Sequence, residues 1–175
     1  ENYVEYVFAT EYGCDYTMAE IEAAQDEVAR EFVPVYQSYV ADVMGDDIDG
    51  AFDALDESEE TLMANARACV VRVSPALGES FDHLVDNGLA SEAKVRNSYT
   101  VEMAAYNDGC VFVNPNTEVA DCAAIVHEFG HFNHMYRVRA NSFMPNTVVD
   151  VQEIMSQGLE LLCYDHYDVL CPGYG

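Results

Sequence analysis

Apolar residues recur every three or four positions along residues 18–43, the spacing that places them on one face of an α-helix. Thr17 and Glu20 precede this pattern as a capping box, in which each side chain accepts a hydrogen bond from the other residue's backbone N–H. Pro34 lies inside the pattern and marks a candidate kink. The pattern therefore predicts a first helix from about residue 18 to about residue 43.

Two shorter helices are predicted next, each opened by a serine. Ser58 can cap a helix whose apolar positions again share one face, namely Leu62, Ala66, Cys69 and Val73. Ser74 and Pro75 begin the other helix, because serine caps a helix and proline suits its first turn. Asn87 and Gly88 end it, since glycine readily adopts the left-handed conformation that stops many helices.

Residues 98–114 have a different pattern. Apolar residues alternate with other residues in the first half, and Asn107-Asp108-Gly109 forms a turn before a second apolar run. Alternation with a period of two is typical of strands, so a β-hairpin is predicted over residues 98–114. Two more helices are predicted after it, over about 119–138 and about 148–168.

The predicted fold is mainly α with a small β-hairpin. A length of 175 residues, half of them hydrophobic (50%), suits one folded domain, residues 1–175. Its parts are an N-terminal helical portion, 1–90, the hairpin, 98–114, and a pair of C-terminal helices, 119–168.

The charge balance excludes two classes of partner. The chain has 32 acidic and 7 basic residues, and its net charge is -25. Binding to phosphate backbones or to anionic membranes needs clustered Lys and Arg, so neither nucleic acid nor a membrane surface is expected as a partner. No uncharged run is long enough to cross a bilayer. The acidity fits a high-salt host or a preference for basic peptides, and the sequence does not choose between them.

The six cysteines are Cys14, Cys69, Cys110, Cys122, Cys163 and Cys171. None forms a Cys-x-x-Cys pair, which disfavours a thiolate zinc site. Most are interpreted as buried free thiols in a reducing compartment, which predicts a cytoplasmic location.

An acidic segment, residues 45–60, has part of the pattern of a calcium-binding loop. Asp47, Asp49 and Gly50 have suitable spacing, but the first ligand position would be Gly45 and the last Asp56 in place of glutamate. A solvated linker is therefore the favoured interpretation of this segment.

The helix predicted over 119–138 contains His127-Glu128-Phe129-Gly130-His131, a His-Glu-x-x-His motif. Residues four apart share a helical face, so both imidazoles can reach one metal ion. Glu128 is then close enough to a water molecule at the metal to take its proton. The alternative is a helix with two surface histidines.

A catalytic zinc ion usually has three protein ligands, so a third must come from elsewhere. His134 is too far along the helix axis and is expected not to bind the metal. Glu153 is the better candidate, because it begins a polar stripe on the last helix, made of Glu153, Gln157, Glu160 and Tyr164. Such a stripe can face the metal helix, and the alternative is that it faces water.

Both motifs resemble those of the zinc oligopeptidases of the oligoendopeptidase F and thimet oligopeptidase type. Residues 127–131 match that family's His-Glu-x-Gly-His, and residues 153–157 match its Glu-x-x-Ser-Gln, whose glutamate is the third zinc ligand. The likeness covers most of the chain and is closest to the oligoendopeptidase F branch, through Tyr16-Thr17, Val33-Pro34-Val35-Tyr36, Ser74-Pro75-Ala76-Leu77-Gly78 with Phe81, Asn87-Gly88-Leu89 and residues 111–116. It implies a helical gluzincin-type catalytic core with a small β-hairpin before the zinc-binding helix.

The resemblance implies one Zn²⁺ per chain with three ligands: His127, His131 and Glu153. Glu128 would act as general base and then give its proton to the leaving amine. Glu160 is similar to the family's second acidic residue on the same helix, and together with Gln157 it would support the site from behind the ligands. The hairpin would offer a strand edge to an oligopeptide substrate through four residues: Val111, Phe112, Val113 and Asn114.

The function implied is a zinc metalloendopeptidase that hydrolyses short peptides. The alternatives are a related zinc carboxypeptidase and an inactive zinc-binding module, and Gln157 disfavours a thermolysin-like enzyme, which has aspartate there. The family's catalytic domain is several hundred residues long, so the remainder is expected to be missing from this chain, including downstream Tyr and His residues that stabilise the oxyanion. Tyr164, His166 and Tyr167 are interpreted as packing or exposed aromatic residues.

Overall fold

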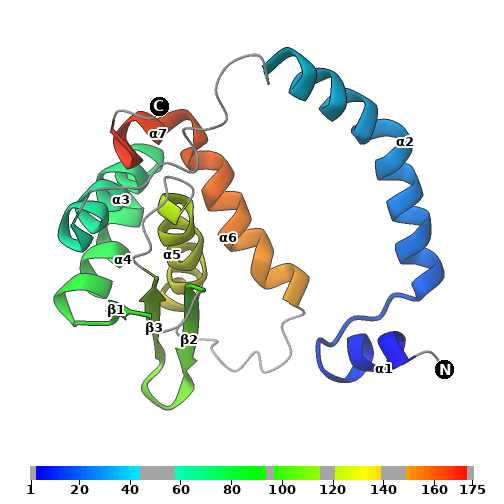
Figure 1. Ribbon diagram of the computed structural model, residues 1–175. Coiled ribbons are helices and arrows are strands. Elements are labelled where there is room, and N and C mark those ends of the chain that lie inside the picture. The colour runs from blue at the N-terminus through cyan, green and yellow to red at the C-terminus, as the bar shows by residue number, and fades with distance from the viewer. Residues whose placement is uncertain (1–2, 44–57, 94–96, 115–120, 139–148, 173–175) are drawn as a thin grey trace. The chain divides into compact units, whose positions relative to one another are not determined.

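The computed structural model describes residues 3–43, 58–93, 97–114, 121–138 and 149–172 (Figure 1). The chain divides into two compact units, residues 1–49 with 146–149 and residues 50–145 with 150–175. The single domain predicted from the length stays a prediction. Most of the acidic segment, with Asp47 and Asp49, lies outside the described residues.

The first unit contains two helices, α1 (Tyr3–Thr10) and α2 (Met18–Val43). The bounds of α2 are those predicted. The capping box is formed, because the backbone N–H of Thr17 donates to Glu20 Oε2 over 2.7 Å and that of Glu20 donates to Thr17 Oγ1 over 3.3 Å. Helix α1 was not predicted, and it contacts the start of α2 through Glu5 Oε1, which accepts from the Met18 N–H over 3.0 Å.

The second unit begins with α3 (Glu59–Val73) and α4 (Pro75–Asp86). Ser58 caps α3 as predicted, since its Oγ accepts from the Thr61 N–H over 3.2 Å. Ser74 occupies the cap position of α4, but its side chain makes no capping hydrogen bond, so that part of the prediction is wrong. The stop signal is confirmed, because Gly88 has a φ of +63°.

A three-stranded sheet follows, in the order β1-β3-β2 (Figure 1). The predicted hairpin is confirmed as β2 (Tyr99–Met103) and β3 (Asp108–Val113), which pair antiparallel around the short 3₁₀ turn η2 (Ala104–Tyr106). The additional strand β1 (Ala90–Glu92) pairs parallel with β3. It escaped prediction because three residues are too few to show alternation.

Two long helices complete the unit, α5 (Asp121–Arg137) and α6 (Val149–Cys163). Helix α6 is shorter than the predicted 148–168, because the chain continues as a 3₁₀ turn, η4 (Tyr164–His166), and a short helix, α7 (Tyr167–Leu170). The main core lies between α3, α4, α5 and β3 and includes Phe81 against Phe129, with ring centroids 4.7 Å apart. The described residues confirm the predicted fold class, mainly α with a small sheet.

The cysteines follow the prediction in part. Cys14, Cys69 and Cys163 are buried and Cys110 is half-buried, and these four cysteines take no part in a disulfide. The prediction is wrong for Cys122 and Cys171, which the fold joins as a disulfide between the start of α5 and the residue after α7. A sequence separation of 49 residues gives no hint of this pairing. The cytoplasmic location stays a prediction.

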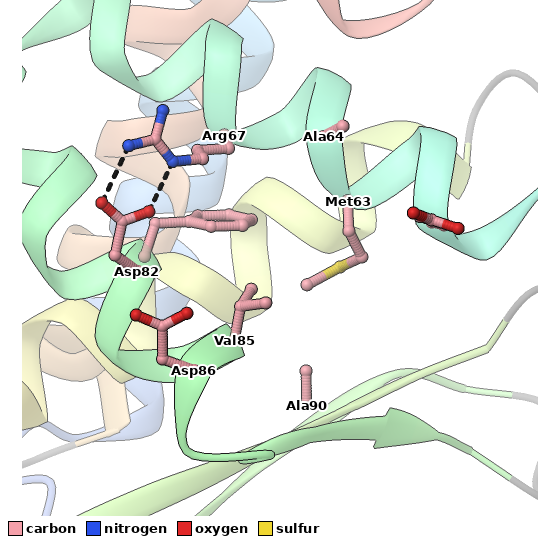
Figure 2. Close-up of a pocket in the computed structure, with 9 residues that line it drawn as sticks. Met63, Ala64, Arg67, Asp82, Val85, Asp86 and Ala90 are labelled. Atoms are coloured by element: carbon pink, nitrogen blue, oxygen red, sulfur yellow. Dashed lines mark hydrogen bonds and ion pairs between the residues drawn. The ribbon is translucent and has the colours of Figure 1, made fainter.

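A pocket lies between α3, α4 and β1 (Figure 2). Its apolar lining consists of Met63, Ala64, Phe81, Val85 and Ala90. On one wall, Arg67 donates two hydrogen bonds to Asp82, from Nε to Oδ1 over 2.5 Å and from Nη2 to Oδ2 over 2.8 Å. The hydrogen bonds from Arg67 hold the pKa of Asp82 below its usual value. None of the lining residues belongs to the two motifs near residues 127 and 153.

Candidate metal centre

Helix α5 lies between the sheet and α6, and this determines where its polar residues point. On one side it packs against the sheet, where a Cβ added to Gly109 of β3 would lie 3.0 Å from Met135 and 3.5 Å from Phe132. On another side it meets α6, where a Cβ added to Gly130 would lie 2.6 Å from the Cα of Ser156. Successive helical residues are about 100° apart, so His127 and Glu128 face different neighbours.

His127 and His131 share the face of α5 that looks toward α6. Their ring centroids are 5.0 Å apart, as expected for residues one helical turn apart. Their side chains are 25% and 15% exposed. The alternative of two solvated surface histidines is therefore not what the structure shows.

Gly130 allows α6 to approach this face. Besides the Cα of Ser156, an added Cβ would meet the carbonyl oxygen of Met155 at 2.9 Å and the backbone nitrogen of Ser156 at 3.2 Å. These are backbone atoms of the facing helix, so they cannot move aside without moving α6. The close approach of α6 thus explains why glycine is found here, although glycine costs about 1 kcal/mol in a helix interior.

The close approach brings Glu153 of α6 between the two imidazoles. Glu153 Oε2 lies 3.3 Å from His127 Nε2, and Oε1 lies 3.6 Å from His131 Nε2. Ligand atoms of all three residues lie within 4.8 Å of one another, and this is the one such group of three or more in the part of the chain that the structure describes. His134 does not belong to the group, as predicted from its position on the helix.

These separations are close enough for the three side chains to hold one metal ion, and zinc gives a reference for the distances. Zinc–nitrogen and zinc–oxygen bonds of about 2.0–2.2 Å in a tetrahedral site place the ligand atoms about 3.3–3.6 Å apart. The distances from His127 Nε2 to Glu153 Oε2 and from His131 Nε2 to Glu153 Oε1 lie in that range, and each ends on a different oxygen of the carboxylate. Two imidazoles and one carboxylate also form a ligand set typical of catalytic zinc, which leaves a fourth position for water or substrate.

Two contacts orient the ligands. Glu160 Oε2 lies 3.2 Å from His127 Nδ1, so the carboxylate engages one ring nitrogen while Nε2 faces Glu153. Ser156, which is fully buried, donates from Oγ to Glu153 Oε2 over 2.9 Å. Such outer contacts fix the ring orientation and the carboxylate rotamer of metal ligands. The polar stripe predicted that Glu160 lies near the metal helix. Ser156 was not named as a site residue, but its position three residues after Glu153 places the two on the same face of α6 and could have indicated the contact.

Burial also favours the protonation state that a metal needs. It lowers the pKa of His131 below the ordinary value, and it outweighs the nearby carboxylates of Glu153 and Glu128, which act in the opposite direction. A neutral imidazole is the form that binds a metal ion.

Glu128 contacts the hairpin. It is buried, with 8% of its surface exposed. Its carboxylate accepts a hydrogen bond from Thr100 of β2, with Oγ1 to Oε2 at 2.7 Å. Sequence reasoning did not find Thr100, because a single threonine in a strand carries no signal of its partner.

The other predicted site residues lie further from this centre or have other contacts. Gln157 of α6 is exposed, and its supporting role stays a prediction. Residues 111–113 are the second half of the central strand β3, which pairs with β1 on one edge and β2 on the other. The Asn114 N–H donates to Ser98 Oγ over 3.0 Å. The edge of β3 expected to be open is therefore occupied, and among the described strands the outer ones are β1 and β2. Tyr164 is 69% exposed and Tyr167 packs against the core, in line with the interpretation of these aromatic residues.

Several solved structures share this fold. The chain matches a crystal structure assigned as an oligoendopeptidase F with a TM-score of 0.77 at 20% identity, and it matches one so assigned from Bacillus anthracis str. Ames with a TM-score of 0.79 at 19% identity. PZ peptidase A with an inhibitor gives a TM-score of 0.77 at 18% identity. No model of a protein family and no curated protein matches the chain.

These matches cover 96–97% of this chain but only 33–35% of the matched chains. The chain therefore spans about a third of the length of the solved structures that it matches. At 18–20% identity such a likeness establishes the fold. The chain thus has the fold of one third of an oligoendopeptidase F-type structure, as the resemblance in its sequence implied.

Proposed function

We propose that the chain is the zinc-binding part of a metallopeptidase of the oligoendopeptidase F type, which hydrolyses internal bonds of short peptides. The observation that supports this most strongly is the convergence of His127, His131 and Glu153, with the buried Glu128 beside them. The shared fold of peptidase structures supports the same proposal.

His127, His131 and Glu153 would hold one zinc ion per chain. When bound, zinc supplies a Lewis acid that polarises the scissile carbonyl and lowers the pKa of water to about 7. In the proposed reaction the water oxygen bonds to the carbonyl carbon while a carboxylate oxygen of Glu128 takes the water proton. The carbon–nitrogen bond then breaks, and Glu128 returns that proton to the leaving amine nitrogen.

The proposed substrate is an oligopeptide. An extended peptide can add to the open edge of a sheet, where backbone hydrogen bonds hold it and side-chain pockets select it. The peptide would then pair with an outer strand, β1 or β2, and residues 111–114 would not pair with it directly, since β3 is already paired on both sides.

In the described part of the chain, no helix combines the length and the apolar character that crossing a membrane requires.

The proposal is tested by metal content and by peptide hydrolysis. Elemental mass spectrometry of the purified chain should give about one zinc per chain. A peptide blocked at both ends, with a fluorophore and a quencher, should be cleaved at an internal bond. Glu128→Gln should retain zinc and lose about 10²- to 10⁴-fold in rate, the typical share of a general base.

Glu27→Gln is the matched control, because it makes the same substitution at an exposed position on α2, outside the sheet. It should leave both the zinc content and the rate unchanged. Full activity of Glu128→Gln would rule out its role as base. Removal of single residues from unblocked peptides, without cleavage of the blocked one, would favour a carboxypeptidase, and bound zinc with no hydrolysis would favour a zinc-binding module.

A further inference from the structure

A threonine on the hairpin contacts the proposed general base twice. Thr100 Oγ1 lies 2.7 Å from the carboxylate Oε2 of Glu128 and 3.0 Å from the backbone carbonyl oxygen of the same residue. The hydroxyl has one proton, which it can share between these two acceptors. Among the described residues, Thr100 is the one hydrogen-bond partner of the Glu128 carboxylate.

The sheet register fixes the direction of this side chain. Thr100 of β2 is paired with Val111 of β3, and residues directly opposite each other project from the same face of a sheet. Val111 is 1% exposed and belongs to the core with Phe129 and Phe132 of α5. Thr100 is therefore directed toward α5 by the backbone pairing, independently of its own rotamer.

A glutamate that acts as a general base must be held in one orientation, and the hydrogen bond from Thr100 can do this for Glu128. A glutamate side chain has three rotatable bonds, and a general base must lie within hydrogen-bond reach of the proton that it removes. A misplacement of about 1 Å at a reacting group can cost about a hundredfold in rate. His127 and His131 face α6, so they do not orient the carboxylate on the side of the hairpin.

We propose that Thr100 is a positioning residue, whose hydroxyl holds the Glu128 carboxylate in the orientation needed to take the proton of the attacking water. This inference rests on the proposed function. It assigns to the hairpin a part in catalysis that differs from holding the peptide, because Thr100 acts through Glu128.

The test compares two substitutions at one position. Thr100→Val keeps the shape of the side chain and removes the hydroxyl, and it should lower kcat about 10- to 100-fold with KM and zinc affinity changed less than about twofold. Thr100→Ser restores the hydroxyl and should return kcat to within about threefold of the original chain. A kcat within about twofold of the original in Thr100→Val would overturn the proposal. So would a serine variant as slow as the valine variant.

Ser80→Ala is the control for a purely structural effect. Ser80 is fully buried, and its hydroxyl donates to Asn133 Oδ1 of α5 over 2.7 Å, so it joins α4 to α5 at a distance from Glu128 along the helix. Its removal should lower the thermal stability while leaving kcat unchanged. An equal loss of kcat in Ser80→Ala and Thr100→Val would show that general loosening of α5 is responsible, and would overturn the proposal.

A second measurement separates this proposal from the proposed function. In the metal-free chain, the effect of Thr100→Val on the unfolding equilibrium is measured with Glu128 and again with Glu128→Ala. A hydrogen bond to a carboxylate should make the two effects differ by about tenfold in the unfolding constant. If the two effects differ by less than about twofold, the proposed contact between Thr100 and Glu128 is overturned, whether or not the chain hydrolyses peptides. If they differ by about tenfold but the chain hydrolyses no peptide, the result counts against the proposed function alone.

Discussion

Gly130 sets the spacing between the two helices that carry the proposed metal ligands, and Gly130→Ala tests this directly. The added Cβ would lie 2.6 Å from the Cα of Ser156, whereas carbon atoms in contact prefer about 3.5–4.0 Å. The helices must therefore separate by about 1 Å, because the atoms on the other side belong to the backbone of α6. Glu153 moves with α6, away from His127 and His131.

Two effects of opposite sign determine the size of the change. Overpacking of this kind costs about 1–3 kcal/mol, and replacement of a helical glycine by alanine returns up to about 1 kcal/mol. If the full 1 kcal/mol is returned, the net loss in the free energy of unfolding is about 0–2 kcal/mol, which is at most about 8 °C in Tm for a chain of this size. Zinc binding should be more sensitive, since ligand distances tolerate only about 0.2 Å, and we expect a loss of at least about tenfold in affinity.

Gly158→Ala on α6 is the matched control. It makes the same substitution in a helix that carries a ligand, but an added Cβ there would meet no atom within 4 Å. It should stabilise the chain by about 0.5–1 kcal/mol and leave the zinc affinity unchanged. The affinity is measured by competition with a chromophoric chelator, and Tm is measured on the metal-free chain.

The reasoning would be refuted by a Gly130→Ala variant that binds zinc as tightly as the original chain. It would also be refuted if Gly158→Ala lost affinity to the same extent, because the effect would then not depend on the contact with Ser156. Loss of stability without loss of affinity would show that the helices separate elsewhere than at Glu153.

Three further changes have defined outcomes. Glu153→Ala should abolish stoichiometric zinc binding in the chelator assay, because it removes one of three ligands; unchanged affinity would place the third ligand elsewhere. Glu160→Gln should weaken zinc about 10- to 100-fold through the orientation of His127, without a comparable change in Tm. Burial raises the pKa of Tyr167 to about 12, so its contribution to stability holds below about pH 10 and is lost as the pH rises toward 12. In an ultraviolet titration, Tyr167→Phe should remove one tyrosine that ionises near pH 12.

The elements that the sequence predicts correctly are those whose signals are local. The capping box at Thr17, the serine cap at Ser58 and the left-handed Gly88 each depend on residues within one helical turn. The His-Glu-x-x-His motif is local in the same sense, since one turn of helix places His127 and His131 side by side. The position of Glu153 beside these histidines was predicted because a polar stripe on an apolar helix has a period that can be read from the sequence.

The features that escaped prediction depend on contacts between distant segments. Strand β1 exists because β3 offers it an edge, and nothing in Ala90–Glu92 indicates a strand by itself. The pairing of Cys122 with Cys171 depends on where α7 ends relative to α5. Thr100 contacts Glu128 only because the register of the hairpin places it opposite Val111.

The same contrast explains how one short motif can serve two different tasks. The three polar residues of the motif lie on two sides of α5: the histidines face α6 and its Glu153, and Glu128 faces β2. The third side is apolar, and Phe129 is fully buried there against Phe81 of α4. Because this side is fixed in the core, α5 cannot rotate to favour one task over the other. The motif therefore supplies the chemical groups, whereas α6 and the hairpin, each docked on its own side of the helix, set the distances at which those groups act.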